Sequence, residues 1–140
     1  MRPRIAPPFA LGIALSACAQ GSAEIPVYQP PAGSNEVLRG PIEAAPGHSL
    51  VTADIVLGAG GRVPLHYHHG EEFLTILGGS ATVLRPGMPD LVLAPGEAFR
   101  IPPGTVHAAI AGPEGLRAIA SWVVPDGKPL RVAVPEEQGQ

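Results

Sequence analysis

Short apolar runs, each ended by Gly or Pro, follow one another along most of the chain. No window keeps the period of an amphipathic helix, whereas short strands separated by such turns are typical of an all-β sandwich or barrel. Gly supplies the positive φ that tight turns need, and Pro presets the neighbouring corner. The pattern therefore predicts strands over residues 51–57, 62–68, 73–77, 81–85, 91–93, 98–101, 106–110, 116–124 and 130–134.

The N-terminal segment has a different pattern, that of a secretory signal peptide over residues 1–18. Arg2 and Arg4 make its start positive, an apolar run over residues 5–14 follows, and small residues come next. The run is too short to span a bilayer as a helix. The sequence Leu15-Ser16-Ala17-Cys18 resembles the bacterial lipobox, in which the cysteine carries the lipid. This resemblance implies lipid attachment at Cys18 and membrane contact only through that anchor.

Two other interpretations of this segment stay open. Ala17-Cys18-Ala19 also fits an ordinary cleavage site, which would give a free secreted protein, and the third interpretation is an uncleaved tail. Either form of signal places the protein in the periplasm or cell envelope of a bacterium. After it, the Pro-rich residues 19–40 are expected to form a linker, residues 41–136 one folded domain and residues 137–140 a polar tail.

The composition supports a folded domain and argues against several functional classes. Of the 140 residues, 18 are Gly and 18 are Pro, but 45% are hydrophobic and only 15% are charged, unlike a disordered chain. A net charge of −3 and 4% aromatic residues supply neither a basic patch nor a stacking platform, which argues against a nucleic acid partner. The single cysteine allows no intrachain disulfide and no Cys-x-x-Cys zinc site.

The histidines supply the candidate chemistry. His66 and His68 share one face of a predicted strand, because side chains alternate with a period of two, and neutral imidazole is the commonest metal ligand. Glu72 follows after a turn and adds a carboxylate, and His107 begins a later strand. A His-x-His pair alone more often consists of two surface or hydrogen-bonded histidines. The pair by itself therefore leaves both interpretations open.

The glycines and prolines around these histidines resemble the two motifs of the cupin family. The first motif, Gly-x5-His-x-His-x3-Glu-x6-Gly, is met at every spacing by Gly60, His66, His68, Glu72 and Gly79. The second, Gly-x5-Pro-x-Gly-x2-His-x3-Asn, is met by Gly96, Pro102, Gly104 and His107, with Ala111 where the family often has Asn. The resemblance covers residues 45–135, which is nearly the whole predicted domain.

The resemblance to cupins implies an all-β double-stranded β-helix, a jelly-roll barrel that forms a single domain. It also implies that His66, His68, Glu72 and His107 bind a divalent transition metal, drawn from Fe, Mn, Ni, Cu and Zn. Two coordination positions would stay open on an octahedral ion, for a small-molecule substrate or dioxygen. The ligand set resembles that of flavonol-type cupin dioxygenases, which implies a metal-dependent dioxygenase with Glu72 as catalytic base. The alternative is a non-catalytic module that binds a metal or a small molecule.

Strand parity assigns the residues next to these ligands. Glu71 is expected on the outer face, His69 on the surface or beside the ligands, and His48 in a solvated loop. Ala111 removes no ligand and affects only the hydrogen bonding expected at the end of its strand.

The pocket around the metal is expected to be apolar. Its predicted walls are Leu74, Ile76, Phe99, Ile101, Ala109, Ala111, Trp122 and Val124. The arginines at positions 62, 85, 100 and 117 are expected at exposed strand ends, so that an apolar ligand is favoured over an anion. The long apolar run over residues 116–124 is compatible with a homodimer.

Overall fold

The structure of the protein is a computed structural model that describes residues 27–135. The predicted signal segment with Cys18 and the tail over residues 137–140 lie outside the described residues. Within residues 27–135 there are eight strands and no helix, which confirms the all-β prediction. The strands are β1 (Gly33–Pro41), β2 (His48–Leu57), β3 (Arg62–Tyr67), β4 (Glu72–Leu84), β5 (Leu91–Leu93), β6 (Ala98–Ile101), β7 (His107–Pro125) and β8 (Val132–Ala133).

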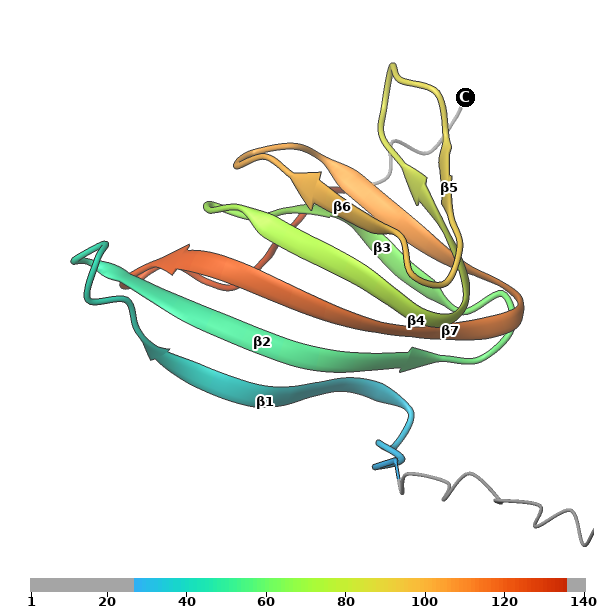
Figure 1. Ribbon diagram of the computed structural model, residues 1–140. Helices are drawn as coiled ribbons and strands as arrows, with labels where there is room; N and C mark the ends of the chain where they lie inside the picture. The colour runs from blue at the N-terminus through green and yellow to red at the C-terminus, as the bar shows by residue number, and fades with distance from the viewer. Residues whose placement is uncertain (1–26, 136–140) are drawn as a thin grey trace, which may run out of the picture.

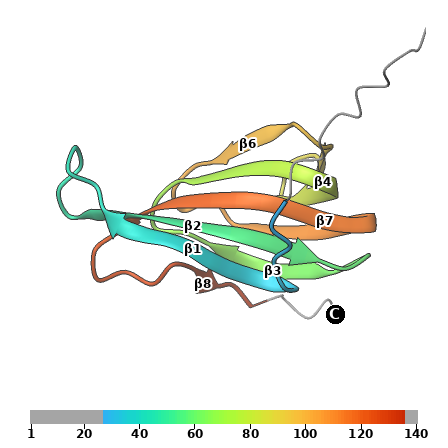
Figure 2. The same ribbon diagram turned by 60° about the horizontal axis from the view of Figure 1, so that its bottom comes forward.

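The strands form a folded-over antiparallel sheet of the double-stranded β-helix type (Figure 1). Strand β7 pairs with β2 along its second half, with β3 near its start, and with β4 along most of its length. The short strands β5 and β6 pair with the two ends of β4 (Figure 1), and β8 pairs with β3 (Figure 2). Because the sheet folds over, residues from β3, β4 and β7 face one interior.

The core fills this interior with small and branched side chains. Ile76, Val51 and Val83 are the largest side chains that are fully buried, and Trp122 is 5% exposed. Alternating burial along β4 and β7 places every second residue inward, as expected for a barrel with one wet face. Among the described residues no helix is long and apolar enough to cross a bilayer.

The predicted linker over residues 19–40 is wrong in its last part, because Gly33–Pro41 forms strand β1. This strand pairs with β2 from Gly33↔Val56 to Pro41↔Ser49, with a bulge near residue 37. Most of its side chains are exposed, so its sequence carries little of the apolar alternation that identifies a half-buried strand. Backbone pairing with an existing sheet edge therefore creates β1, and composition does not reveal it.

Two predicted strand ends are also wrong, because the chain continues in the same strand. Gly78 and Gly79 were expected to close a strand but lie inside β4, where the register with β7 shifts. Gly112 and Pro113 similarly lie inside β7. Gly79 has a φ of 65°, and such a residue serves a β-bulge as well as it serves a turn. The predicted strand 130–134 shortens to β8.

Candidate metal centre

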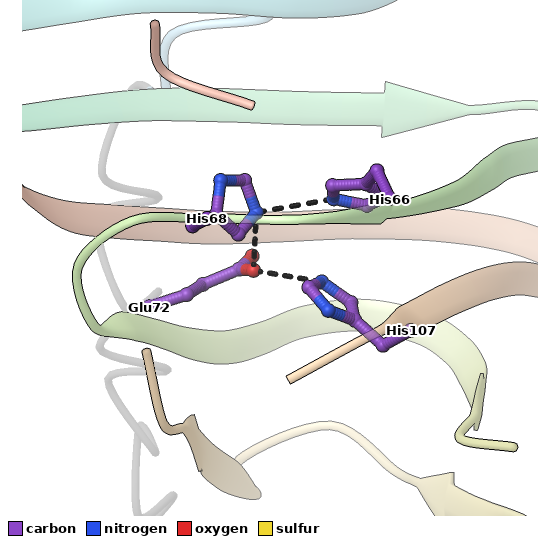
Figure 3. Close-up of side chains that lie close together, drawn as sticks. All are labelled: His66, His68, Glu72 and His107. Carbon is purple, nitrogen blue, oxygen red and sulfur yellow. Dashed lines mark hydrogen bonds and ion pairs between the residues drawn. The ribbon is translucent and has the colours of Figure 1, made fainter. Parts of the chain in front are cut away.

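Three strands bring the four predicted ligands together (Figure 3). His66 lies in β3 and His68 directly after it, on the same face of the chain, as the period of two requires. Glu72 is the first residue of β4 and His107 the first residue of β7. His66 and His107 are register partners across β3 and β7. The site therefore sits where one end of each of these strands meets the interior.

The ligand atoms of these four residues converge on one small volume. His66 Nε2 lies 3.1 Å from His68 Nε2, and Glu72 Oε2 lies 3.0 Å from His68 Nε2 and 3.1 Å from His107 Nε2. All four ligand atoms lie within 4.8 Å of one another, and each residue is buried. Such a set of three imidazoles and one carboxylate fits a divalent metal site of the cupin type.

Backbone carbonyls fix the orientation of all three rings. The Nδ1 atoms of His66, His68 and His107 lie 2.7, 2.5 and 2.9 Å from the carbonyl oxygens of Pro64, Leu130 and Thr105. A carbonyl only accepts, so each Nδ1 carries the proton and donates it. In the neutral ring, each Nε2 therefore directs a lone pair toward the others and toward Glu72. Lone pairs and a carboxylate this close together repel unless a cation, either a proton or a metal ion, lies between them.

Trp122 is a neighbour of the site whose polar role was not predicted. Its Nε1–H donates to His68 Nε2 at 3.2 Å, and the two ring centroids lie 5.7 Å apart. Parity alone indicated a wall residue. The hydrogen bond depends on which edge of the indole faces His68, and this is decided by long-range pairing, because Trp122 lies opposite Glu72 of β4 and Val51 of β2.

Burial and pairing set the protonation states of the site. Burial alone would raise the pKa of Glu72, but its close contacts with His107 and His68 outweigh burial and lower that pKa to about 2. The pKa of His66 is lowered to about 4, chiefly by burial and also by the nearby His107 and His68, while the Pro64 carbonyl and Glu72 oppose this shift. At neutral pH, Glu72 is thus ionised and His66 is neutral, the forms that bind a metal ion.

Acid is expected to destabilise the metal-free protein. Unfolded His66 takes a proton near its ordinary pKa of 6.5, whereas the folded residue takes it only near 4, so stability falls as the pH drops through this window. We expect a loss of about 2 kcal/mol between pH 7 and pH 5, measured by urea unfolding in a chelator. The His66→Gln variant should lose this slope, and an equal slope in both proteins would contradict the assignment.

A cavity of about 630 Å³ opens above the four ligands. Most of its walls are apolar, and they come from β1, β2, β3, β4, β6 and β7 and from the segment before β8. Of the predicted wall residues, Leu74, Ile101, Ala109 and Trp122 line the cavity, while Ile76, Ala111 and Val124 pack in the core and Phe99 packs against it. The ligand cluster and an apolar cavity are thus parts of one site, a favourable arrangement for a small organic molecule.

The remaining sequence-predicted neighbours lie away from the cluster. Glu71 faces outward and pairs with Arg100, as strand parity predicted. His69 packs edge-on against Tyr67, with ring centroids 5.5 Å apart. His48 begins β2 at the opposite end of that strand from the β2 residues that line the cavity. None of these three residues belongs to the ligand cluster.

The arginines were expected at exposed strand ends, away from the pocket ligand, but exposure does not keep all of them from the cavity. Arg62 is exposed, as expected, yet it is one of the residues that line the cavity, and so is Arg131. Arg85 and Arg117 instead contact Pro89 and Asp54. Exposure of a long side chain does not determine which way its head group points. The cavity is therefore apolar along its walls but carries positive charge among its lining residues.

Comparison with known proteins agrees with this site. Residues 53–124, which are 72 of the 140 in the chain, match the model of the Cupin_2 cupin domain. A dimethylsulfoniopropionate lyase of Ruegeria pomeroyi, DddW, is 40% identical over 75 residues, which are 54% of this chain and 48% of that protein. The chain thus spans about half the length of the curated relative that it matches.

Solved structures with the same fold include enzymes. The dimethylsulfoniopropionate lyase DddQ of Ruegeria pomeroyi is similar with a TM-score of 0.55 and 27% identity, over 68% of this chain and 47% of that one. The polyketide cyclase RemF of Streptomyces resistomycificus has a TM-score of 0.50 and 26% identity, over 64% of this chain and 63% of that one. A cupin-like protein of Thermotoga maritima, at 24% identity and a TM-score of 0.53, shows the same fold. The chain belongs to the cupin family.

Proposed function

We propose that this protein is a metal-dependent enzyme that acts on a small organic molecule. One observation supports the proposal above all others. Three imidazole Nε2 atoms, each oriented by a backbone carbonyl, and one ionised carboxylate converge at the floor of a 630 Å³ cavity. A site built only for packing would not orient three buried lone pairs toward a buried carboxylate.

His66, His68, Glu72 and His107 would hold Fe, Mn, Ni, Cu or Zn, any of which accepts imidazole and carboxylate ligands. Such an ion, when bound, supplies Lewis acidity and open coordination positions. The apolar walls exclude water around the substrate and hold its carbon skeleton. Glu72 contacts His68 and His107 through Oε2 only, and its other oxygen makes no hydrogen bond among the described residues. That oxygen is the proposed general base.

Two reaction classes are proposed for this base. The likeness to the lyases DddW and DddQ favours elimination, in which Glu72 takes a proton from carbon and the bond to the leaving group breaks. The likeness of the ligand set to flavonol-type dioxygenases favours oxygenation, in which Glu72 takes a proton from a substrate hydroxyl. Glu72 is the one carboxylate among the cavity-lining residues that the structure describes, so either reaction depends on it.

The two classes differ in their need for oxygen. Protein loaded with each metal in turn is incubated with dimethylsulfoniopropionate without oxygen, and release of a volatile sulfide is measured by gas chromatography. A panel of flavonols and other small enols is tested with an oxygen electrode. At matched metal content, Glu72→Gln should lower the rate of whichever reaction the protein catalyses by about 100-fold. A metal-loaded protein that turns over neither set would contradict the enzyme proposal and favour the non-catalytic binding module.

The cell envelope is the proposed location. Its support is the signal-like pattern of residues 1–18 and the lipobox resemblance that ends at Cys18. Fractionation of bacteria that express the full chain tests it, because Cys18→Ala should move the protein out of the membrane fraction if Cys18 carries lipid.

A further inference from the structure

Two arginines border the cavity without an acceptor of their own. Arg62 begins β3 and Arg131 immediately precedes β8, and both lie among the residues that line the cavity. Neither side chain makes a hydrogen bond or an ion pair with any of residues 27–135. Both guanidinium groups are therefore free to bind a ligand that enters the cavity.

The other arginines in residues 27–135 are all engaged. Arg39 pairs with Glu36, Arg100 with Glu71 and Arg117 with Asp54, while Arg85 donates to the Pro89 carbonyl and lies over the Phe99 ring. In this part of the chain, the two arginines without an acceptor are the two that line the cavity. If these two arginines contributed only to solubility or to folding, there would be no reason for both of them to border the cavity and lack an acceptor.

The charge balance of the cavity also favours an anion. The whole chain has a net charge of −3, yet Glu72 is the only carboxylate among the described residues that line the cavity. The positive charge of a divalent ion bound by the four ligands would exceed the negative charge of that carboxylate. The two guanidinium groups add further positive charge, and the remaining walls are apolar. An anionic group on an apolar body is the ligand that matches this distribution.

The two arginines border the cavity from neighbouring segments, since β3 pairs with β8 and Arg131 immediately precedes β8. Arg62 begins β3 next to Val63, another cavity-lining residue, and a bulge between Val63 and His66 interrupts the alternation of faces along the strand. Arg131 follows Leu130, whose carbonyl accepts from His68 Nδ1. A guanidinium group binds the two oxygens of a carboxylate through parallel hydrogen bonds.

We infer that the cavity selects a small organic carboxylate, whose carboxylate group pairs with Arg62 and Arg131 while its other end reaches the His/Glu cluster. This inference rests on the proposed function, since it names the substrate class of the same site. Arg62 and Arg131 are specificity-determining residues in this scheme. They lie outside the ligand set, so their replacement leaves metal binding intact.

Two probes that differ only in the carboxylate test the inference. The protein is loaded with Co²⁺, whose visible bands report metal binding and whose charge-transfer band reports a bound thiol. Anaerobic titrations then compare 3-mercaptopropanoate with its methyl ester, in the original protein and in the Arg62→Gln/Arg131→Gln double variant. Any difference in thiol acidity between the probes is the same for both proteins, so it cancels when their acid-to-ester affinity ratios are compared.

The acid-to-ester affinity ratio should fall by about tenfold in the double variant, with each single variant in between. Arg100→Gln is the matched control, because its guanidinium pairs with Glu71 on the outer face, and its ratio should stay unchanged. An equal ratio in the original protein and the double variant would overturn the inference while the Co²⁺ bands still support the metal site. Absence of those bands in the original protein would contradict the proposed function, and the inference with it.

Discussion

Replacing His66 or His68 by alanine is expected to abolish tight metal binding. Each substitution removes one of the three nitrogen ligands and leaves only two nitrogens and the Glu72 carboxylate to bind the ion. Loss of residues that merely support a ligand already lowers metal affinity by 10- to 100-fold, so loss of a ligand should cost at least about 100-fold. Elemental analysis after loading and dialysis should find near-stoichiometric metal in the original protein and almost none in either variant.

Two other histidines provide the control for this experiment. His48→Ala and His69→Ala remove imidazoles that lie outside the cluster, so both variants should keep their full metal content. Urea unfolding with a chelator shows whether a variant still folds. Folded His66→Ala and His68→Ala proteins that retain stoichiometric metal would refute the assignment of these residues as ligands.

Gly70→Ala is expected to destabilise the protein more than any other single added methyl group in the site. Gly70 lies between His68 and Glu72, and an added Cβ would overlap the backbone carbonyl of Val123 in β7. Backbone on both sides of this contact must then move, since no flexible side chain is there to yield. Overpacking of this kind costs about 3 kcal/mol or more in unfolding free energy. Because Val123 also donates to the Glu71 carbonyl at 3.0 Å, the movement should displace Glu72 and weaken metal binding.

Gly78→Ala is the matched control for this substitution. Gly78 lies in β4, but a Cβ there would meet nothing within 4 Å, and its φ is not positive. Its unfolding free energy in urea should change by less than about 1 kcal/mol, and its metal content should not change. Equal stability of the two alanine variants would show that the chain can yield around Gly70, contrary to the expectation.

The ligand cluster could be predicted from the sequence because its determinants are local. His66 and His68 are two residues apart in one strand, and the Gly–Pro frames around them and around His107 resemble those of cupins. The same parity argument correctly placed Glu71 on the outer face. The spacing could not supply the carbonyl contacts of the three Nδ1 atoms, because one of those carbonyls belongs to Leu130, far along the chain.

The predictions that proved wrong share a different cause, because each feature depends on which strands pair with one another. Strand β1 exists because β2 offers it an edge, and its own exposed residues give no signal. Gly78 and Gly79 bend a continuous strand because β7 accompanies β4 past them. Arg62 and Arg131 border the cavity because β3 and β8 pair with each other beside it. Long-range pairing decides these features, and a single sequence does not encode it in any local window.

Strand β7 gives the molecule a distinctive unfolding behaviour. It is bonded to β2, β3 and β4, so no layer of the sheet can detach while the others persist. The domain should therefore unfold in one cooperative transition in which tryptophan fluorescence and backbone circular dichroism change together. His107 is the first residue of β7, and the other ligands lie on its partner strands or beside them. A bound ion would therefore be released when these strands separate in global unfolding. Metal release and global unfolding would then proceed as one step, and a tightly held ion would raise the melting temperature of the whole barrel.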